Sequence, residues 1–163
     1  MNAPKRTLSE MQQRVINADT LKHDVVNAKE MLRLEMLSSF KAYTKAMFKA
    51  QYKRNFIVAE HHEKIIKALQ DVVDGKCRRL IINIAPRYGK TELVIKSFIS
   101  WCFALNPKCR FLHLSYSDVL VADNSDTVRS IMQESLYKEL FPQSKLEKEK
   151  ASNKRWRTAA GGE

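Results

Sequence analysis

LIINIAPRYGKTE (residues 80–92) is the stretch that decides the predicted fold. Its first six residues form an apolar, isoleucine-rich run of strand length, and the chain then turns through Pro86 and Gly89. The segment that follows, TELVIKSFISWCFALNP (residues 91–107), is apolar nearly all round and ends at Asn106-Pro107, as a buried helix does. We therefore predict a buried strand, a tight turn and a buried helix.

The turn contains the centre of a Walker A phosphate loop. Gly89, Lys90 and Thr91 follow one another directly between the strand and the helix. Gly89 lets the backbone turn close to phosphates, and the amides that begin the helix point at the anion. We expect Lys90 to bridge the β- and γ-phosphates and the Thr91 hydroxyl to coordinate magnesium. The expected cofactors are ATP and Mg²⁺.

The rest of the chain from residue 80 onward repeats this alternation. RFLHLSY (residues 110–116) is a second strand candidate, and a helical pattern follows it as far as Phe141-Pro142. Residues 143–155 look like a polar loop, and RWRTAAGGE (residues 155–163) has the pattern of a strand that enters a turn. Strands that alternate with helices predict an α/β fold with a parallel sheet, here the first part of a P-loop NTPase sheet.

A long helical region precedes this sheet. Apolar residues recur every three or four positions from Leu8 to Met47, which predicts an amphipathic arm or a pair of helices. A second helical pattern starts near His62 and stops at Gly75, a residue type that closes many helices. We divide the chain into a helical arm (residues 1–55) and part of an ATPase domain (residues 56–163).

The charge of the chain favours a polyanionic partner. The 163 residues include 29 basic and 18 acidic side chains, a net charge of +11, and the excess lies mainly in the flanks of a nearly neutral middle. Nucleic acid is therefore the leading partner, and a solvated surface is the alternative. The sequence has neither a signal peptide nor an apolar run long enough for a membrane span, so we expect a soluble, intracellular protein and no membrane partner.

The substituted loop resembles the variant phosphate loop of phage terminase large subunits, the ATPases of viral DNA packaging. Ile84 stands where the general motif has glycine, and P-R-x-G-K-T-E (residues 86–92) matches the variant. The likeness extends over about residues 56–163. It includes EHHEKIIKALQDVVDGKCRRLIINIAPR (60–87), WCFALNPKCRFLHLSYSD (101–118), DNSDTVRSIM (123–132), YKELFP (137–142) and KRWRTAAGG (154–162).

The resemblance implies roles for individual residues. Arg87 and Lys90 would be catalytic, with Arg87 near the γ-phosphate; a surface arginine paired with Glu92 is the alternative. The residues implied to contact the nucleotide are Pro86, Arg87, Tyr88, Gly89, Lys90, Thr91, Glu92 and His62. The pair His61-His62 would lie beside the adenine or simply begin a helix. For Arg129 we favour an ion pair with Asp126 or Glu134 over an arginine finger.

The resemblance also implies a machine larger than this chain. A terminase large subunit acts in the cytoplasm of the host cell, assembles into a ring, contacts the small terminase subunit and the portal, and drives double-stranded DNA into a procapsid. Its Walker B acidic pair and nuclease carboxylates would lie beyond the double glycine, so we expect nucleotide binding, weak turnover and marginal stability. The alternatives are a helicase-like P-loop ATPase and a non-catalytic truncated protein that binds DNA or a partner.

Overall fold

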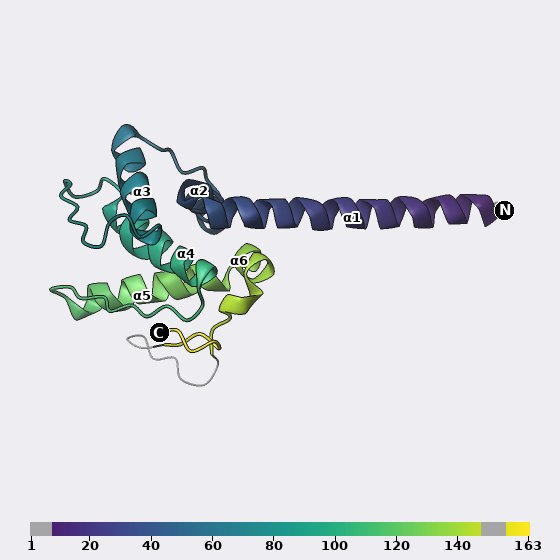
Figure 1. The fold of residues 1–163 in the computed structure, drawn as a ribbon. Helices are drawn as coiled ribbons and strands as arrows, with labels where there is room; N and C mark the ends of the chain where they lie inside the picture. Colours follow the sequence, from purple (N-terminus) through teal and green to yellow (C-terminus); the bar gives the residue numbers. More distant parts are fainter. Residues whose placement is uncertain (1–7, 148–155) are drawn as a thin grey trace.

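The chain folds into helices. The computed structural model describes residues 8–147 and 156–163, and describes side chains in these ranges from His23 onward. In chain order the helices are α1 (Leu8–Ser38), α2 (Phe40–Tyr52), α3 (Glu60–Val73), the π-helix η1 (Glu92–Ser97), α4 (Phe98–Leu105), α5 (Asp118–Gln133), α6 (Ser135–Leu140) and the 3-10 helix η2 (Pro142–Ser144). Helices α2 to α6 gather into one body, and α1 projects from it (Figure 1).

The predicted α/β class is wrong. The described residues form no β-strand, and their one β-bridge pairs Leu146 with Thr158. Residues 80–85 and 110–116, the two strand candidates, lie outside any helix but form no ladder with each other. A strand needs hydrogen bonds to a neighbouring strand, and the apolar runs that we recognised report only the local conformation. The parallel P-loop NTPase sheet is therefore not formed.

The C-terminal segment forms a tight turn instead of a strand. The amide of Gly161 donates to the Thr158 carbonyl at 2.9 Å, and Gly161 has a φ of +90°. At Gly162 a Cβ atom would lie 2.2 Å from the carbonyl oxygen of Pro107, so only glycine fits. The next residue, Glu163, accepts a bond from the Phe111 amide (2.7 Å) and donates one to the Cys109 carbonyl (3.0 Å).

The N-terminal region is a pair of helices, one of the two predicted arrangements. The break falls at Ser39, whose hydroxyl accepts a hydrogen bond from the Ala42 amide at 3.2 Å and so caps α2. The apolar stripe is buried or half-buried from Leu32 to Met47, as predicted, but Val25 and Ala28 are exposed. Its members between Leu8 and Leu21 lie outside the residues whose side chains are described.

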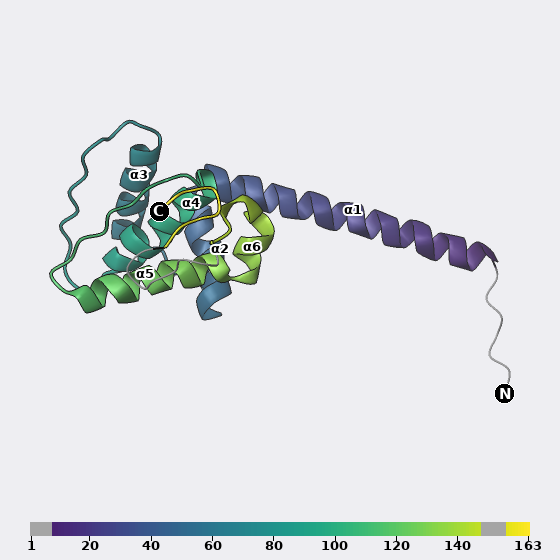
Figure 2. The same ribbon diagram turned by 90° about the horizontal axis from the view of Figure 1, so that it is seen from below.

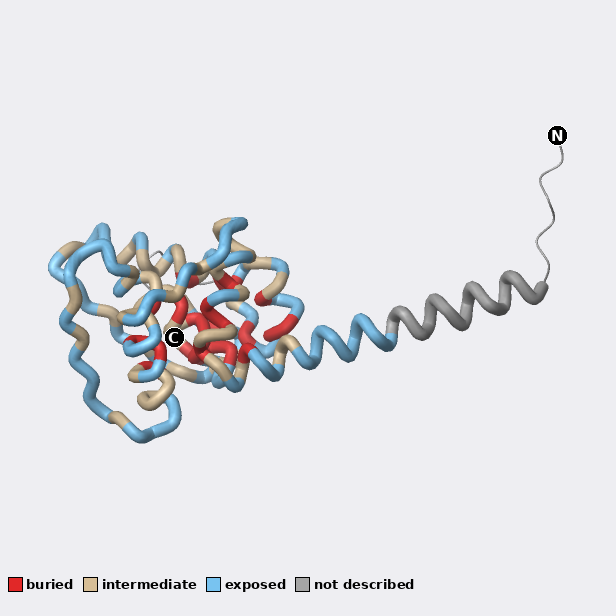
Figure 3. Tube along the Cα trace, turned by 90° about the horizontal axis from the view of Figure 1, so that it is seen from above, coloured by how far each residue is buried: buried red, intermediate tan, exposed pale blue. Residues whose placement is uncertain are grey.

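The core joins helices that are far apart in the sequence. Buried side chains of α1 and α2 pack with those of α3, η1, α4, α5 and α6, and Figure 3 shows the buried segments gathered where these helices meet. The largest side chains that are almost completely buried are Trp101, Tyr43, Tyr137, Phe40, Phe103 and Phe141. The helices at the N-terminus therefore complete the core on which residues 80–105 rest.

Several helix ends agree with the sequence. Helix α3 stops just before Gly75, whose φ is +75°, and α4 stops at Leu105, one residue before Asn106-Pro107. The predicted helix that reaches Phe141 is divided at Glu134 into α5 and α6. Of the predicted polar loop, residues 148–155 lie outside the described part of the chain.

Candidate phosphate-binding loop

The loop at residues 86–89 leads into a helix, as predicted, but the strand that the motif places before it is not formed, because residues 80–85 have no regular secondary structure. The helical course begins at Lys90 and continues through η1 and α4 to Leu105. Two loop residues have left-handed backbone conformations, Arg87 with a φ of +69° and Gly89 with a φ of +76°. A positive φ is uncommon outside glycine, so the loop holds Arg87 in a strained conformation.

Gly89 is fixed by a contact as well as by its backbone. A Cβ atom at this position would lie 2.8 Å from Nε2 of His62, closer than such atoms approach one another. His62 comes from the first turn of α3, where its Nδ1 accepts a hydrogen bond from the Ala59 amide at 3.1 Å. Because Nδ1 accepts this bond, Nε2 faces the loop. The first turn of α3 and the phosphate loop therefore touch at His62 and Gly89.

This contact shifts the titration of His62. Its pKa is lowered from the ordinary value of 6.5, first by burial and then by the neighbouring His61, while a hydrogen bond to the Tyr88 backbone acts in the opposite direction. The two imidazole rings lie 3.9 Å apart between centroids, and the Phe56 ring lies 5.1 Å from His62. The fold thus favours the neutral form of His62.

The helix beyond the loop presents unpaired amides. Its first backbone bond runs from the Leu93 amide to the Gly89 carbonyl at 3.0 Å, so the amides of residues 90–92 have no acceptor among the described residues. Lys90 and Thr91 are exposed, and Thr91 makes no capping bond with its side chain. Free amides, a positive helix end, an ammonium and a hydroxyl together favour an anion.

Glu92 lies inward from these groups and is already paired. Its carboxylate lies 3.2 Å from Nζ of Lys96, one turn along the helix, and accepts a hydrogen bond from the Tyr52 hydroxyl at 3.4 Å. Burial raises the pKa of Tyr52, and the Glu92 carboxylate raises it as well. For Lys96, burial acts to lower the pKa, but the Glu92 carboxylate acts in the opposite direction and the pKa is raised overall. Glu92 therefore anchors η1 to α2 and has no ion pair with Arg87.

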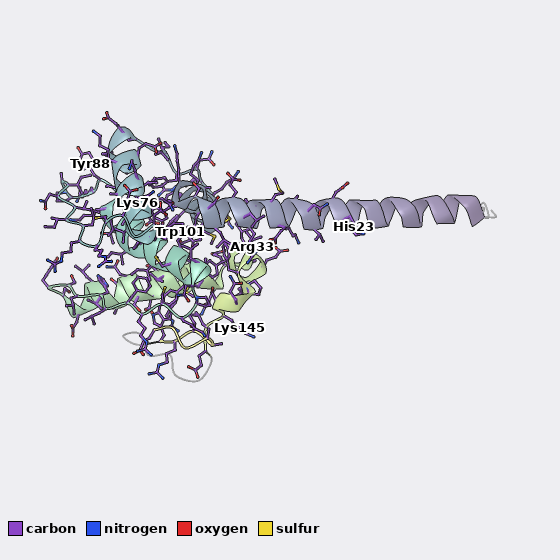
Figure 4. All side chains as sticks on the ribbon, viewed as in Figure 1. His23, Arg33, Lys76, Tyr88, Trp101 and Lys145 are labelled. Carbon is purple, nitrogen blue, oxygen red and sulfur yellow. The ribbon has the colours of Figure 1, made fainter. Side chains whose placement is uncertain are left out.

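Tyr88 and His61 form the outer side of the loop. Their rings lie 5.4 Å apart at an interplanar angle of 77°, and Tyr88 is half exposed on the side of the body away from the free end of α1 (Figure 4). His61 Nε2 is buried without a hydrogen-bond partner in the described part of the chain. Aromatic rings of this kind suit stacking against a planar group.

The remaining predicted residues are distributed as follows. Pro86 and Arg87 are exposed, and Arg87 has no ion-pair partner within residues 8–147 and 156–163. Arg129 pairs with Asp126 at 3.3 Å, the structural role that we favoured. Sequence reasoning missed Tyr52 and Lys96, which support Glu92, and Phe56, which packs on His62. The spacing of Glu92 and Lys96 is the usual helical ion-pair spacing and could have revealed that pair.

Magnesium has limited support from the protein itself. Among the side chains that the structure describes, no group of three or more His, Cys, Asp or Glu residues is placed to hold a metal ion. Mg²⁺ in nucleotide sites takes few protein ligands and keeps phosphate and water oxygens, so the exposed Thr91 hydroxyl fits one of its positions. The fit is that of a nucleotide-borne ion, not of a site built by the chain alone.

Comparisons with known proteins give the chain no relatives. No protein-family model, curated protein or solved structure matches it. A separate search of the described helices found none with both the length and the apolarity needed to cross a membrane.

Proposed function

We propose that residues 86–91 bind the phosphates of Mg²⁺-ATP, and that the chain is the ATP-binding part of a viral DNA-packaging motor of the terminase type. One observation carries the nucleotide site. At Gly89 a positive φ coincides with a close contact, in which an added Cβ would lie 2.8 Å from Nε2 of His62, directly before a helix start whose amides have no acceptor among the described residues. Such a turn brings main-chain donors close to a ligand, which is what a phosphate loop does.

Each residue of the loop has a physical task in this proposal. The amides of Lys90 and Thr91 would donate to phosphate oxygens, and the Lys90 ammonium would neutralise the charge that they carry. The Thr91 hydroxyl would hold Mg²⁺, which supplies the Lewis-acid stabilisation of the phosphates. Arg87, exposed and without an ion pair in the described residues, would reach the γ-phosphate.

Turnover would be slow in this proposal. Hydrolysis needs a group that orients the attacking water, and Glu92, the nearest acidic residue in the sequence, is occupied by Lys96 and Tyr52. The chain would therefore bind ATP more readily than it would hydrolyse it.

Nucleotide binding is tested with Lys90→Ala. A fluorescent ATP analogue, titrated with Mg²⁺ present, should bind the wild type and should bind Lys90→Ala at least about tenfold more weakly, equivalent to about 1.4 kcal/mol. Lys64→Ala is the matched control, because Lys64 is exposed and, within the described part of the chain, its one ion pair is with Glu60 on α3. Equal affinity of the wild type and Lys90→Ala would remove the site assignment.

We propose that a row of basic residues on α2 and directly after it contacts the DNA. Lysines recur every four residues at positions 41, 45, 49 and 53, Arg54 follows, and no acidic residue occurs from 36 to 59. Lys45, Lys49 and Arg54 are exposed, whereas Lys41 pairs with Glu63. A row of cations with this spacing can neutralise successive phosphates of a duplex.

Duplex binding is tested by its salt dependence. The wild type should bind a short DNA duplex with an affinity that falls steeply as salt rises, and Lys45→Ala/Lys49→Ala should weaken binding and lower the slope by about 2. Lys64→Ala/Lys138→Ala removes the same charge elsewhere and should have a smaller effect. If the two double variants behave alike, α2 is not the DNA surface.

A further inference from the structure

A groove separates the two extended segments of the chain. It has a volume of about 430 Å³, with walls formed by Leu80 and Ile82 on one side and Phe111 and Leu112 on the other. Its floor is apolar and is supplied by α3, η1 and α4, chiefly by Leu69, Val94, Phe98 and Ile99. Figure 2 shows the two connections, before η1 and before α5, running along the same side of these helices.

Both walls have strand-like surfaces. On the first, Ile82 and Ile84 pack against the core while Ile81 is 85% exposed; on the second, Phe111 packs inward while Leu112 is 85% exposed. This alternation has the period of two that characterises a β-strand. The groove is therefore bounded by two segments that already have the side-chain pattern of sheet edges.

The main chain of both walls is free to pair. From Leu80 to Ala85 and from Leu112 to Tyr116 no amide or carbonyl takes part in a main-chain hydrogen bond with another described residue. Unpaired groups in two such rows are a template for an added strand. Between them a strand could form bonds on both of its edges at once.

The charged residues in and around the two walls are all basic. Residues 75–91 and 105–117 contain no acidic residue, and their basic residues are Lys76, Arg78, Arg79, Arg87, Lys90, Lys108 and Arg110. Only Lys76 of this set forms an ion pair within the described residues. Arg78 and Lys90 line the groove itself. An occupant with carboxylates would therefore be favoured electrostatically.

We propose that this groove binds an extended segment of a partner protein by β-strand addition, and that the segment has apolar side chains at alternate positions and carboxylates at its ends. Main-chain pairing supplies affinity, the apolar floor selects the alternating side chains and the basic rim selects the acid. A nucleic acid would match the charge but would use neither the free amide and carbonyl rows nor the apolar floor. The groove shares Lys90 with the proposed nucleotide site, but the inference rests on the apolar floor, the unpaired main chain of the walls and Arg78, which that site does not use.

The test uses a labelled peptide of about seven residues, long enough to pair with all of residues 80–85. The peptide has valine at alternate positions, threonine between them and aspartate at both ends. Its fluorescence anisotropy with the full chain should show saturable binding. An otherwise identical peptide with N-methylated main-chain amides should bind at least about tenfold more weakly, because it cannot donate to the walls.

Protein variants separate the groove from general attraction. Arg78→Glu should weaken binding of the aspartate peptide about tenfold and strengthen binding of a peptide that ends in lysine, whereas Lys64→Glu, a reversal of an exposed charge on α3 outside the groove lining, should change neither. Any one of three results overturns the proposal. The methylated peptide binds as well as the unmethylated one, the two charge reversals have equal effects, or a DNA duplex displaces the peptide in proportion to the charge of the duplex. Binding of the ATP analogue, measured on the same Arg78→Glu protein, should be retained and reports separately on the nucleotide site.

Discussion

The indole N–H of Trp101 donates to the carbonyl oxygen of Met36 at 2.8 Å, and both side chains are completely buried. This bond lies where α1 ends, at a corner that leaves main-chain groups without helical partners. On the other side of the corner the amide of Phe40 donates to the side-chain oxygen of Gln70 at 3.1 Å. Two side chains from distant helices thus satisfy the break between α1 and α2.

Replacement of Trp101 by phenylalanine should destabilise the chain by about 1–3 kcal/mol, because it removes the donor from a buried carbonyl. Urea denaturation followed by circular dichroism measures the change. Trp156→Phe is the matched control: its indole bonds to the Ser125 hydroxyl at 2.8 Å but is only part-buried, so the cost should be smaller. Equal losses in the two variants would contradict the role given to the Met36 carbonyl.

Gly89→Ala should abolish or greatly weaken nucleotide binding, whereas Gly75→Ala should leave it unchanged. Both glycines have a positive φ, and alanine at either position costs about 1–2 kcal/mol in backbone strain. Only at Gly89 would the added Cβ meet another residue, His62, since nothing lies within 4 Å at Gly75. The measurement is ATP-analogue affinity beside the urea midpoint. Similar affinity losses in both variants would show that general strain, not the loop contact, is responsible.

Acidification should loosen the contact between α3 and the loop. The pKa of His62 is lowered in the folded chain, so as the pH falls the unfolded chain binds a proton at this residue before the folded chain does. The stability that neutral His62 contributes is therefore complete above about pH 6.5, and it is lost as the pH falls through the lowered pKa. Stability and nucleotide affinity should both fall over this interval. His62→Gln should flatten the profile and His23→Gln, at an exposed histidine of α1, should not. A profile that His62→Gln leaves unaltered would count against the assignment.

Raising the pH into the alkaline range should destabilise the fold through ionisation of the Tyr43 phenol. Burial holds the pKa of this phenol well above its ordinary value of 10.0, with a smaller contribution from Tyr137. The stability that neutral Tyr43 contributes is therefore complete below pH 10 and is lost as the pH rises toward the raised pKa. Tyr43→Phe should reduce the alkaline loss while costing about 1 kcal/mol at neutral pH, since its bond to Ser100 disappears. Unfolding followed at several alkaline pH values would reveal an unchanged slope if this is wrong.

Local patterns in the sequence predicted the helices and the turn well. The stop at Gly75, the stop before Asn106-Pro107 and the burial of Phe40, Tyr43 and Met47 follow from short-range rules of periodicity and capping. The loop with its helix start at Lys90 follows from the order of glycine, lysine and threonine.

Contacts between residues far apart in the sequence could not be predicted from those short-range rules. Residues 80–85 have the composition of a strand, but whether a strand forms depends on a partner elsewhere, and here a groove lies beside them. The bond from Trp101 to Met36 joins residues 65 positions apart, and the contact of His62 with Gly89 depends on how α3 packs. No spacing in the sequence reports such distances.

The corner at Ser39 has a mechanical consequence for α1. With both sides of the break hydrogen-bonded, the 31-residue helix leaves the body in a set direction and reaches about 46 Å at 1.5 Å per residue. Trp101 ties the inner end of α1 to the helical course that starts at Lys90, and Lys29 and Arg33 tie α1 to α6 through Glu139 and the Leu140 carbonyl. The inner part of α1 is therefore fixed both to the helices behind the loop and to α6.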